Sequence, residues 1–378
     1  MSARVATWLP DGASAEARAV LARVARLAQT EDVAHVAVMP DAHVADDVCV
    51  GTVTATSRRL LPAAVGGDIG CGMVAVRLRA DADLLADRDR AARLLAGLYR
   101  RIPHLMHPSA SAPPLPDELL AARLGAPALE GMKRREGRTE LGTLGRGNHF
   151  LEVQRDDEGA LWLLLHSGSR AMGPAIRQHH EAPASRDPSG IRFLDADSGA
   201  GRVYLDDVAW AAAYARASRA RMVAEAEALF AELFGVEVDA SSRIEIDHNH
   251  VRREEHGGRA LWVHRKGAMG LREGALGVVP GSMGSPSFHV AGRGAEGALG
   301  SSAHGAGRAL PRGEARRRIG ARQLMREAEG VWFDHRLADR LRDEAPSAYK
   351  DIGAVMRAQR DLVRVVRRLS PVLVYKAA

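Results

Sequence analysis

Five short segments, most of them rich in glycine, each place a histidine, cysteine or carboxylate among small residues. In chain order they are Gly67-Asp68-Ile69-Gly70-Cys71-Gly72, Gly147-Asn148-His149-Phe150-Leu151-Glu152, His166-Ser167-Gly168-Ser169-Arg170, Asp247-His248-Asn249-His250 and Ala303-His304-Gly305-Ala306-Gly307-Arg308. Glycine lets the backbone approach a ligand closely, and the flanking side chains are metal ligands or nucleophiles. Because the segments are far apart in the sequence, they predict one composite site that forms when the whole chain folds.

Composition narrows the class of protein. Of the 378 residues 46% are hydrophobic, which is enough for a sizeable core. No apolar run reaches the roughly 18 residues of a membrane span, and the N-terminal residues do not match a signal peptide. Two cysteines exclude a disulfide framework. We therefore expect a cytoplasmic protein without membrane association, and the net charge of +6 is compatible with a polyanionic partner.

Periodicity and turn residues predict the local structure. Helices are expected over residues 15–29, 206–234 (ending at Gly235), 315–342 and 353–368, strands over 33–38 and 48–55, and loops over 108–116 and 182–190. The sequence has no internal repeat and no linker composition. Strands and helices mix without regular β-α-β alternation, which predicts an α+β fold with one domain over residues 1–378.

Oxygen, sulfur and nitrogen ligands occur together in these segments. Asp68 and Cys71 are three residues apart in one glycine-rich loop, and His149, His166 and His248 each stand beside small or polar residues. Such a mixed set suits Mn²⁺, Zn²⁺, Fe²⁺ or Co²⁺, and ligand type alone does not choose among them. The alternative for each histidine is a hydrogen-bonded core or surface residue, and for Cys71 a small buried apolar side chain.

Taken together, the segments resemble the RtcB family of 3′-phosphate RNA ligases. The resemblance is carried, in chain order, by Met39-Pro40-Asp41, residues 62–73, Gly142-Thr143-Leu144-Gly145, Gly147-Asn148-His149-Phe150, residues 166–170, Arg265-Lys266-Gly267-Ala268, Pro280-Gly281-Ser282-Met283-Gly284, residues 304–308, Ala348-Tyr349-Lys350 and Lys376. It covers most of the chain and implies a single RtcB-type domain with a central composite active site.

The resemblance implies a ligase that uses GTP and two Mn²⁺ ions to join an RNA 3′-phosphate or 2′,3′-cyclic phosphate to a 5′-hydroxyl, in RNA repair or tRNA splicing. By position, Asp68, Cys71 and His149 would hold one ion, and Cys71, His166 and His248 the other. His304 would attack the α-phosphate of GTP and carry the guanylate to the RNA 3′ end. An archease-like activator is a candidate partner.

The resemblance also assigns a nucleotide pocket and two phosphate-binding arginines. The pocket residues are Asn148, His149, Phe150, Leu151, Glu152, His248, Asn249, Pro280, Gly281, Ser282, Met283, Ser287, His304, Gly305, Ala306, Gly307 and Lys376. Glu152 is the expected acceptor for a guanine edge. Arg170 and Arg308 are expected to contact RNA or the triphosphate, because guanidinium matches phosphate oxygens bidentately.

One segment departs from the family pattern and leaves other functions open. After Pro40-Asp41-Ala42-His43 the family continues with a glycine-rich, often basic stretch, whereas Asp46 and Asp47 add negative charge here. The chain also looks shorter than typical members. The first alternative is a two-metal phosphohydrolase or cyclic phosphodiesterase without guanylylation, and the second is a non-catalytic RNA-binding relative. A GMP adduct on His304 would distinguish the ligase from both.

Overall fold

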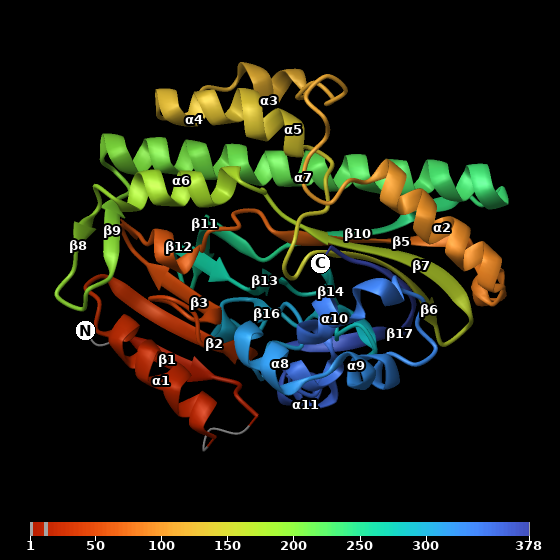
Figure 1. The fold of residues 1–378 in the computed structure, drawn as a ribbon. Coiled ribbons are helices and arrows are strands. Elements are labelled where there is room, and N and C mark those ends of the chain that lie inside the picture. Colours follow the sequence, from red (N-terminus) through yellow and green to blue (C-terminus); the bar gives the residue numbers. More distant parts are fainter. Residues whose placement is uncertain (1–2, 11–13, 378) are drawn as a thin grey trace.

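The computed structural model describes residues 3–10 and 14–377, and two large β-sheets form its centre (Figure 1). The five-stranded sheet consists, in spatial order, of β1 (Arg4–Thr7), β2 (Val33–His43), β3 (Val50–Thr56), β12 (Arg259–Lys266) and β11 (Asn249–His256). Only β1 and β2 pair in parallel, and the other neighbours are antiparallel.

The second sheet has seven strands, and all its neighbours are antiparallel. In spatial order they are β10 (Val238–Asp247), β5 (Gly72–Asp81), β7 (Ala160–Ser167), β6 (Phe150–Asp156), β17 (Val363–Tyr375), β15 (Ser287–Gly292) and β14 (Leu276–Val279). Its outer strands β10 and β14 approach each other, so the sheet curls toward a barrel. Two small sheets contain β13 (Ala268–Gly270) with β16 (Ser301–Ala303), and β4 (Arg59–Leu60) with β9 (Arg192–Asp195) and β8 (Ser185–Arg186).

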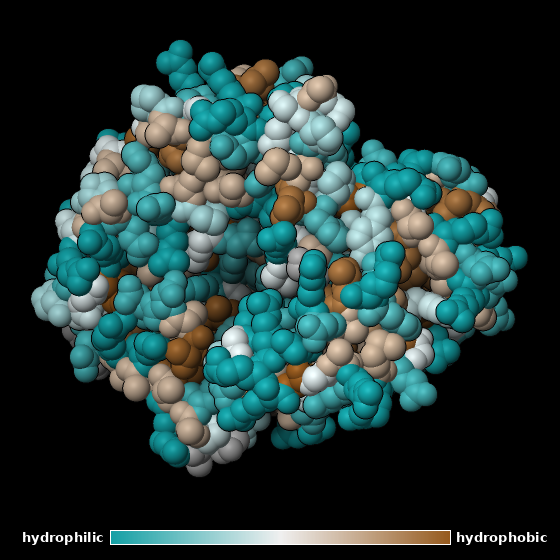
Figure 2. Space-filling model, in the orientation of Figure 1, coloured by the Kyte–Doolittle hydropathy of each residue, from teal (hydrophilic) through white to brown (hydrophobic). Residues whose placement is uncertain are grey.

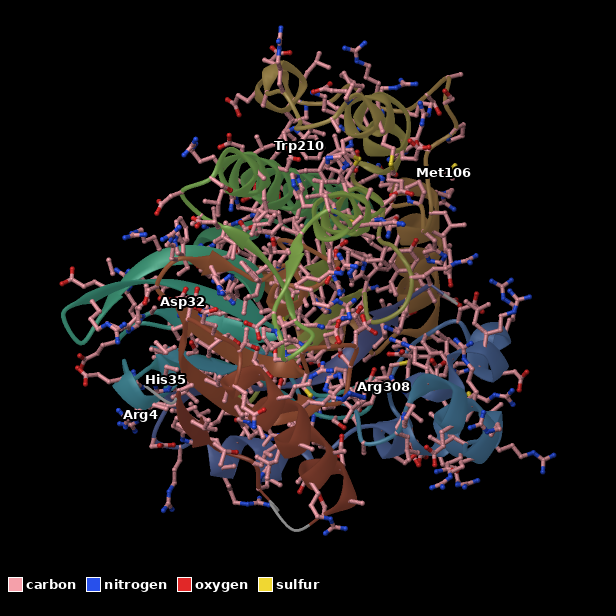
Figure 3. All side chains as sticks on the ribbon, turned by 90° about the vertical axis from the view of Figure 1, so that its left-hand side faces the viewer. Arg4, Asp32, His35, Met106, Trp210 and Arg308 are labelled. Atoms are coloured by element: carbon pink, nitrogen blue, oxygen red, sulfur yellow. The ribbon has the colours of Figure 1, made fainter. Side chains whose placement is uncertain are left out.

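Helices cover the sheets from several sides (Figure 1). One group packs around the longest helix and comprises α7 (Gly199–Phe234), α2 (Arg88–Arg101), α6 (Met172–Glu181), α3 (Asp117–Ala121), α4 (Pro127–Met132) and α5 (Arg138–Glu140). The indole N–H of Trp210 in α7, labelled in Figure 3, donates to the carbonyl oxygen of Leu119 in α3. The remaining helices are α1 (Ala15–Ala28), which packs on β2, and α8 (Arg312–Arg318), α9 (Ala321–Glu327), α10 (Ala338–Leu341) and α11 (Ile352–Ala358) in the C-terminal part.

The largest core cluster lies between the seven-stranded sheet and the helices α2 and α7. Leu94 and Leu98 of α2 meet Met222 and Leu229 of α7 there, all at most 1% exposed. Hydrophilic side chains cover most of one face of the molecule, which is hollowed near its centre (Figure 2). Within the described residues, no helix has both the length and the apolar composition needed to cross a membrane.

The α+β class and most predicted elements are confirmed. The helix expected over 15–29 is α1, the strands expected over 33–38 and 48–55 lie within or overlap β2 and β3, and the helix over 206–234 is the greater part of α7, which begins earlier at Gly199. Gly235 ends α7 in the left-handed conformation, with φ 67°. The region 108–116 is a loop, and 182–190 is a loop except for the short strand β8.

Two helix predictions near the C-terminus are wrong. Residues 315–342 form several short helices, since Gly320 and Gly330 interrupt the pattern. Of residues 353–368, only those up to Ala358 are helical, and Val363 begins the long strand β17. β17 lies between β6 and β15, where β-branched valines pair well on both sides, and this tertiary pairing outweighs the helical spacing of the arginines.

Candidate active site

The ends of five neighbouring strands meet at one edge of the seven-stranded sheet. Cys71 precedes β5, His149 precedes β6, His166 lies near the end of β7, and His248 and Lys376 follow β10 and β17. These strands are adjacent and antiparallel, in the order β10-β5-β7-β6-β17. Because antiparallel strands alternate in direction, the starts of some and the ends of others fall at the same edge. Residues that are distant in the sequence are thereby brought together, and the predicted position of His166 at a strand end is confirmed.

Two overlapping groups of metal-ligating atoms form at this edge. Asp68, Cys71 and His149 make one group, Cys71, His166 and His248 make the other, and the ligand atoms of each lie within 4.8 Å of one another. Cys71 Sγ is 3.6 Å from Nε2 of His149 and 3.2 Å from Nε2 of His166. Nε2 of His166 is 3.4 Å from Nε2 of His248. The sulfur is therefore common to both groups.

Hydrogen bonds on the far side of the rings decide which imidazole nitrogen faces these groups. Nδ1 of His149 donates to the carbonyl oxygen of Leu144 (3.0 Å), and Nδ1 of His166 donates to that of Asn148 (3.1 Å). A neutral ring then turns its Nε2 lone pair inward. For His149 this lone pair is 2.8 Å from Oδ2 of Asp68, which is also an acceptor. Facing acceptors need a cation between them, so the donor set fits a divalent metal.

Burial controls the charge of these ligands. It lowers the pKa of His166 and of His248 well below the usual imidazole value, which keeps both rings neutral. Burial alone would raise the pKa of Asp68, but positive charge and hydrogen bonding at the His149 ring lower it to about 2, and with that ring neutral a bound cation would have the same effect. Burial, reinforced by Asp68, raises the pKa of the Cys71 thiol well above its ordinary value. A thiolate at this position therefore requires the charge of a bound cation.

His304 follows β16 and is held by Asp41 of β2. Nδ1 of His304 is 2.7 Å from Oδ2 of Asp41, and its backbone N–H donates to the same oxygen at 3.2 Å. The fully buried carboxylate accepts both bonds, so Nδ1 carries a proton, and in the neutral ring the lone pair is on Nε2. The rings of His304 and His248 have centroids 4.7 Å apart. An imidazole held by a buried carboxylate thus lies beside the metal-ligand groups.

Two glycines make these arrangements sterically possible. A Cβ at Gly168 would overlap the carboxylate of Asp68, which also accepts from the backbone N–H of Ser169 at 3.0 Å. Gly307 has φ +73°, and a Cβ there would overlap the carbonyl oxygen of Asp41. A larger residue at position 168 would displace the carboxylate of Asp68, and one at position 307 would displace the backbone of Asp41, whose side chain holds His304.

A cavity of about 340 Å³ opens beside His304. The residues predicted for the site that line it are Asp68, Cys71, Asn148, Phe150, Glu152, His166, His248, Asn249, Pro280, Gly281, Ser282, Met283, His304, Gly305, Ala306, Gly307, Arg308 and Lys376. The fold therefore brings most of the predicted site residues to one cavity.

Glu152 and Lys376 give one part of this cavity its polarity. Glu152 is 4% exposed, and burial raises its pKa to about 8 although the Lys376 ammonium opposes the shift. Its Oε1 has no hydrogen-bond partner among the described residues. Lys376 is also buried and donates to the carbonyl oxygen of His149 at 3.1 Å. This part of the cavity therefore offers a polar ligand a carboxyl oxygen without a hydrogen-bond partner and an ammonium group.

Four predicted residues do not line the cavity. His149 lies behind Asp68, the side chain of Leu151 is in the hydrophobic core, and Ser287 accepts a hydrogen bond from Gln154 at 2.8 Å. The guanidinium of Arg170 donates to Thr143 Oγ1 (3.2 Å) and to a backbone carbonyl oxygen, away from the cavity.

The acidic segment that departs from the family pattern is neutralised locally. Oδ1 of Asp47 is 2.9 Å from Arg26, and Oδ2 of Asp46 is 3.5 Å from Arg177. Both aspartates border a surface groove that shares Gly67 with the cavity. The segment thus lies beside the loop that leads into Asp68.

Several residues at the site were not predicted as site residues from the sequence. They are Asp41, His43, Lys266, Arg312, Glu344 and Tyr349. Asp41, Lys266 and Tyr349 lie within the family-like motifs, so position offered a signal for them. Arg312 and Glu344 stand in an arginine-rich and an acidic stretch that resemble ordinary solvated helix. Arg308, labelled in Figure 3, donates to Tyr349 Oη (3.2 Å) in the same region.

Fold and site together define a class of α+β proteins in which two metal-ligand groups share a cysteine and border a histidine held by a buried aspartate.

Comparison with known proteins identifies the family. The model of the tRNA-splicing ligase RtcB family matches residues 21–125 and 121–377. The RNA-splicing ligase RtcB of Escherichia coli (strain K12) is 34% identical, over 90% of each chain. The tRNA-splicing ligase RtcB of Nanoarchaeum equitans is 27% identical, over 91% of this chain and 88% of its own. The chain belongs to the RtcB family, and it is a ligase.

Proposed function

We propose that this protein is a GTP- and manganese-dependent ligase that joins RNA 3′-phosphate or 2′,3′-cyclic phosphate ends to 5′-hydroxyl ends. The observation that carries the proposal is the His304–Asp41 pair beside the shared cysteine ligand. An imidazole fixed as the Nδ1–H tautomer has its Nε2 lone pair free for attack on phosphorus. The names of the relatives, RNA-splicing and tRNA-splicing ligases, support RNA as the substrate.

The two ligand groups would hold two Mn²⁺ ions, with Cys71 common to both. When bound there, the ions would neutralise the negative charge of the phosphates and the charge that develops during guanylate transfer. Gly305 and Gly307 beside His304 leave room for phosphate oxygens close to the backbone. Glu152 and Lys376 would bind the guanine base at the other part of the cavity.

The chemistry follows from the position of His304. Its Nε2 attacks the α-phosphorus of GTP, an N–P bond forms, and the bond to the β-phosphate oxygen breaks to release pyrophosphate. An oxygen of the RNA 3′-phosphate then attacks the same phosphorus, which breaks the N–P bond and frees the histidine. Attack by the 5′-hydroxyl on the RNA phosphorus releases GMP and seals the strand. A cyclic end is first opened by water. Asp41 stabilises the positive charge on the ring during the first step.

The setting we propose is the cytoplasm, in RNA repair or tRNA processing. Cys49 and Cys71 are both buried and free, which suits a reducing compartment where the Cys71 sulfur stays available to metal. An archease-like activator is part of the proposal as a partner. Of the two arginines, Arg308, which lines the cavity, is the one we propose to contact RNA or the triphosphate.

Labelled GTP tests the proposal directly. With Mn²⁺, the wild-type protein should form an acid-labile adduct with GMP, and His304→Ala should form none while keeping its metal. His179→Ala, which replaces an exposed histidine of α6, serves as the matched control and should form the adduct normally. A wild-type protein that binds metal and cleaves cyclic phosphate without any adduct would instead be the phosphohydrolase.

A further inference from the structure

Glu344 is a buried carboxylate on the wall of the cavity, 5% exposed. Its Oε2 forms an ion pair with the Lys376 ammonium (3.0 Å) and accepts a hydrogen bond from the Tyr349 hydroxyl (2.8 Å). Its Oε1 pairs with Arg312 and lies 3.7 Å from Arg308. Four side chains that line the cavity, Arg308, Arg312, Tyr349 and Lys376, therefore lie close to this single carboxylate.

The position of Lys376 depends most on this contact. An ammonium has three N–H donors, and Lys376 directs one at Glu344 and one at the carbonyl oxygen of His149. The third remains for a ligand in the cavity, and its direction is set by the other two. Burial lowers the pKa of Lys376, and the Glu344 charge opposes that shift. Without Glu344, a buried ammonium would lose the anion that compensates it.

We propose that Glu344 is a positioning residue for nucleotide specificity, which holds Lys376 and Tyr349 where the purine base binds. This rests on the proposed GTP-dependent function. Glu344 acts through Lys376, whose remaining N–H donates to a carbonyl oxygen on the six-membered ring of the base. Guanine has an acceptor at that position, whereas 2,6-diaminopurine has an amino group that would leave the ammonium without its bond.

The neighbouring residue offers a matched control. Asp343 is 1% exposed and, like Glu344, forms an ion pair with Arg312 (2.8 Å). Its other oxygen pairs with Arg316 at 3.2 Å. Among the described residues no hydrogen bond or ion pair joins its carboxylate to Lys376 or Tyr349, and its charge acts on the Lys376 pKa less than that of Glu344 does. Asp343→Asn and Glu344→Gln therefore remove the same kind of buried charge, and each takes away one of the two carboxylate partners of Arg312, but only the second removes the ion-pair partner of Lys376.

The test measures the rate at which the nucleotide adduct forms on the protein. It compares GTP with the triphosphate of 2,6-diaminopurine riboside over a range of concentrations of each. In Glu344→Gln the KM for GTP should rise about tenfold or more, because a partner of a buried charge pair is lost. The maximal rate should change much less, and the preference for GTP should fall. Asp343→Asn should keep the wild-type preference. If the glutamine variant does not fold, Glu344→Asp, which keeps the charge on a shorter side chain, should lose preference in the same way.

The outcomes separate this inference from the proposed function. Unchanged GTP preference in both Glu344 variants, or an equal loss in Asp343→Asn, would overturn the positioning role. Calorimetric binding of the same two nucleotides provides a readout without catalysis. A wild-type protein that binds GTP selectively but forms no adduct refutes the proposed function, while the comparison of the Glu344 variants still stands. A wild-type protein without preference for GTP refutes the positioning role as well.

Discussion

Replacing Asp41 by asparagine removes one charge and leaves the shape of the site nearly unchanged. In the structure both donors from His304 reach the same oxygen, Oδ2, so the amide oxygen of asparagine can accept both bonds. The ring keeps its orientation and its tautomer. What disappears is the negative charge 2.7 Å from Nδ1, at the moment when attack by Nε2 makes the ring positive.

The size of the effect follows from this geometry. Two unit charges about 4 Å apart gain about 4 kcal/mol at an effective dielectric constant of ~20. The neutral hydrogen bond that remains recovers part of this, so the loss in the transition state is about 2–4 kcal/mol. At about 1.4 kcal/mol per tenfold change, the rate of adduct formation should fall by roughly 30- to 1000-fold.

The assay is the rate of GMP adduct formation at saturating GTP, with metal content measured in the same samples. Asp207→Asn is the matched control, because Asp207 is equally buried and pairs with His180 at 2.6 Å, in another part of the fold. It should leave the adduct rate unchanged. If Asp41→Asn forms the adduct within about threefold of the wild-type rate, the charge of Asp41 has no part in activating His304 and the reasoning fails.

Three further predictions concern metal, pH and folding. Cys71→Ala should lose both metal ions and His149→Ala mainly one, measured by mass spectrometry of bound metal, because only the sulfur is common to both ligand groups. Burial would raise the pKa of Glu254, but its bond with Arg265 lowers it to about 2, so the stability it contributes is present above about pH 4.5 and is lost as pH falls toward 2. Urea unfolding should show a loss of at most about 3 kcal/mol over that range, absent in Glu254→Gln. Gly235→Ala should lower the unfolding free energy by about 1 kcal/mol in thermal unfolding, since residue 235 has φ 67°.

The sequence pattern was sufficient to predict a helix or strand where the residues of that element alone show the expected periodicity. The helix α1 and the long helix α7 have apolar faces at helical spacing, and Ser198 and Gly235 cap α7 at its two ends. The strand β17 could not be recognised in this way, because exposed arginines alternate irregularly with its valines. Its conformation is set by its neighbours β6 and β15, and a pattern within one segment carries no information about them.

The site shows the same division between local and tertiary information. Cys71, His149, His166 and His248 stand in motifs that a reader of the sequence can find. The partner of His304 is 263 positions away, and the hydrogen bond forms only because Asp41 in β2 lies next to β16. Glu344 is harder still, because its neighbours Asp343 and Arg342 make the stretch look like a solvated surface.

The position of the site between two sheets explains why most of the chain is needed for it. The metal-ligand groups belong to the seven-stranded sheet, whereas Asp41 belongs to β2 of the five-stranded sheet and His304 follows β16 of a small one. Asn249 joins these parts, since its amide donates to the carbonyl oxygen of Asp68 (2.9 Å) and accepts from the N–H of Gly267 (2.8 Å). A shift of one sheet against the other would separate the histidine from the metal ligands without unfolding either. Packing at this junction, rather than the stability of either sheet alone, therefore determines whether His304 and the metal-ligand groups stay close enough to act together as proposed.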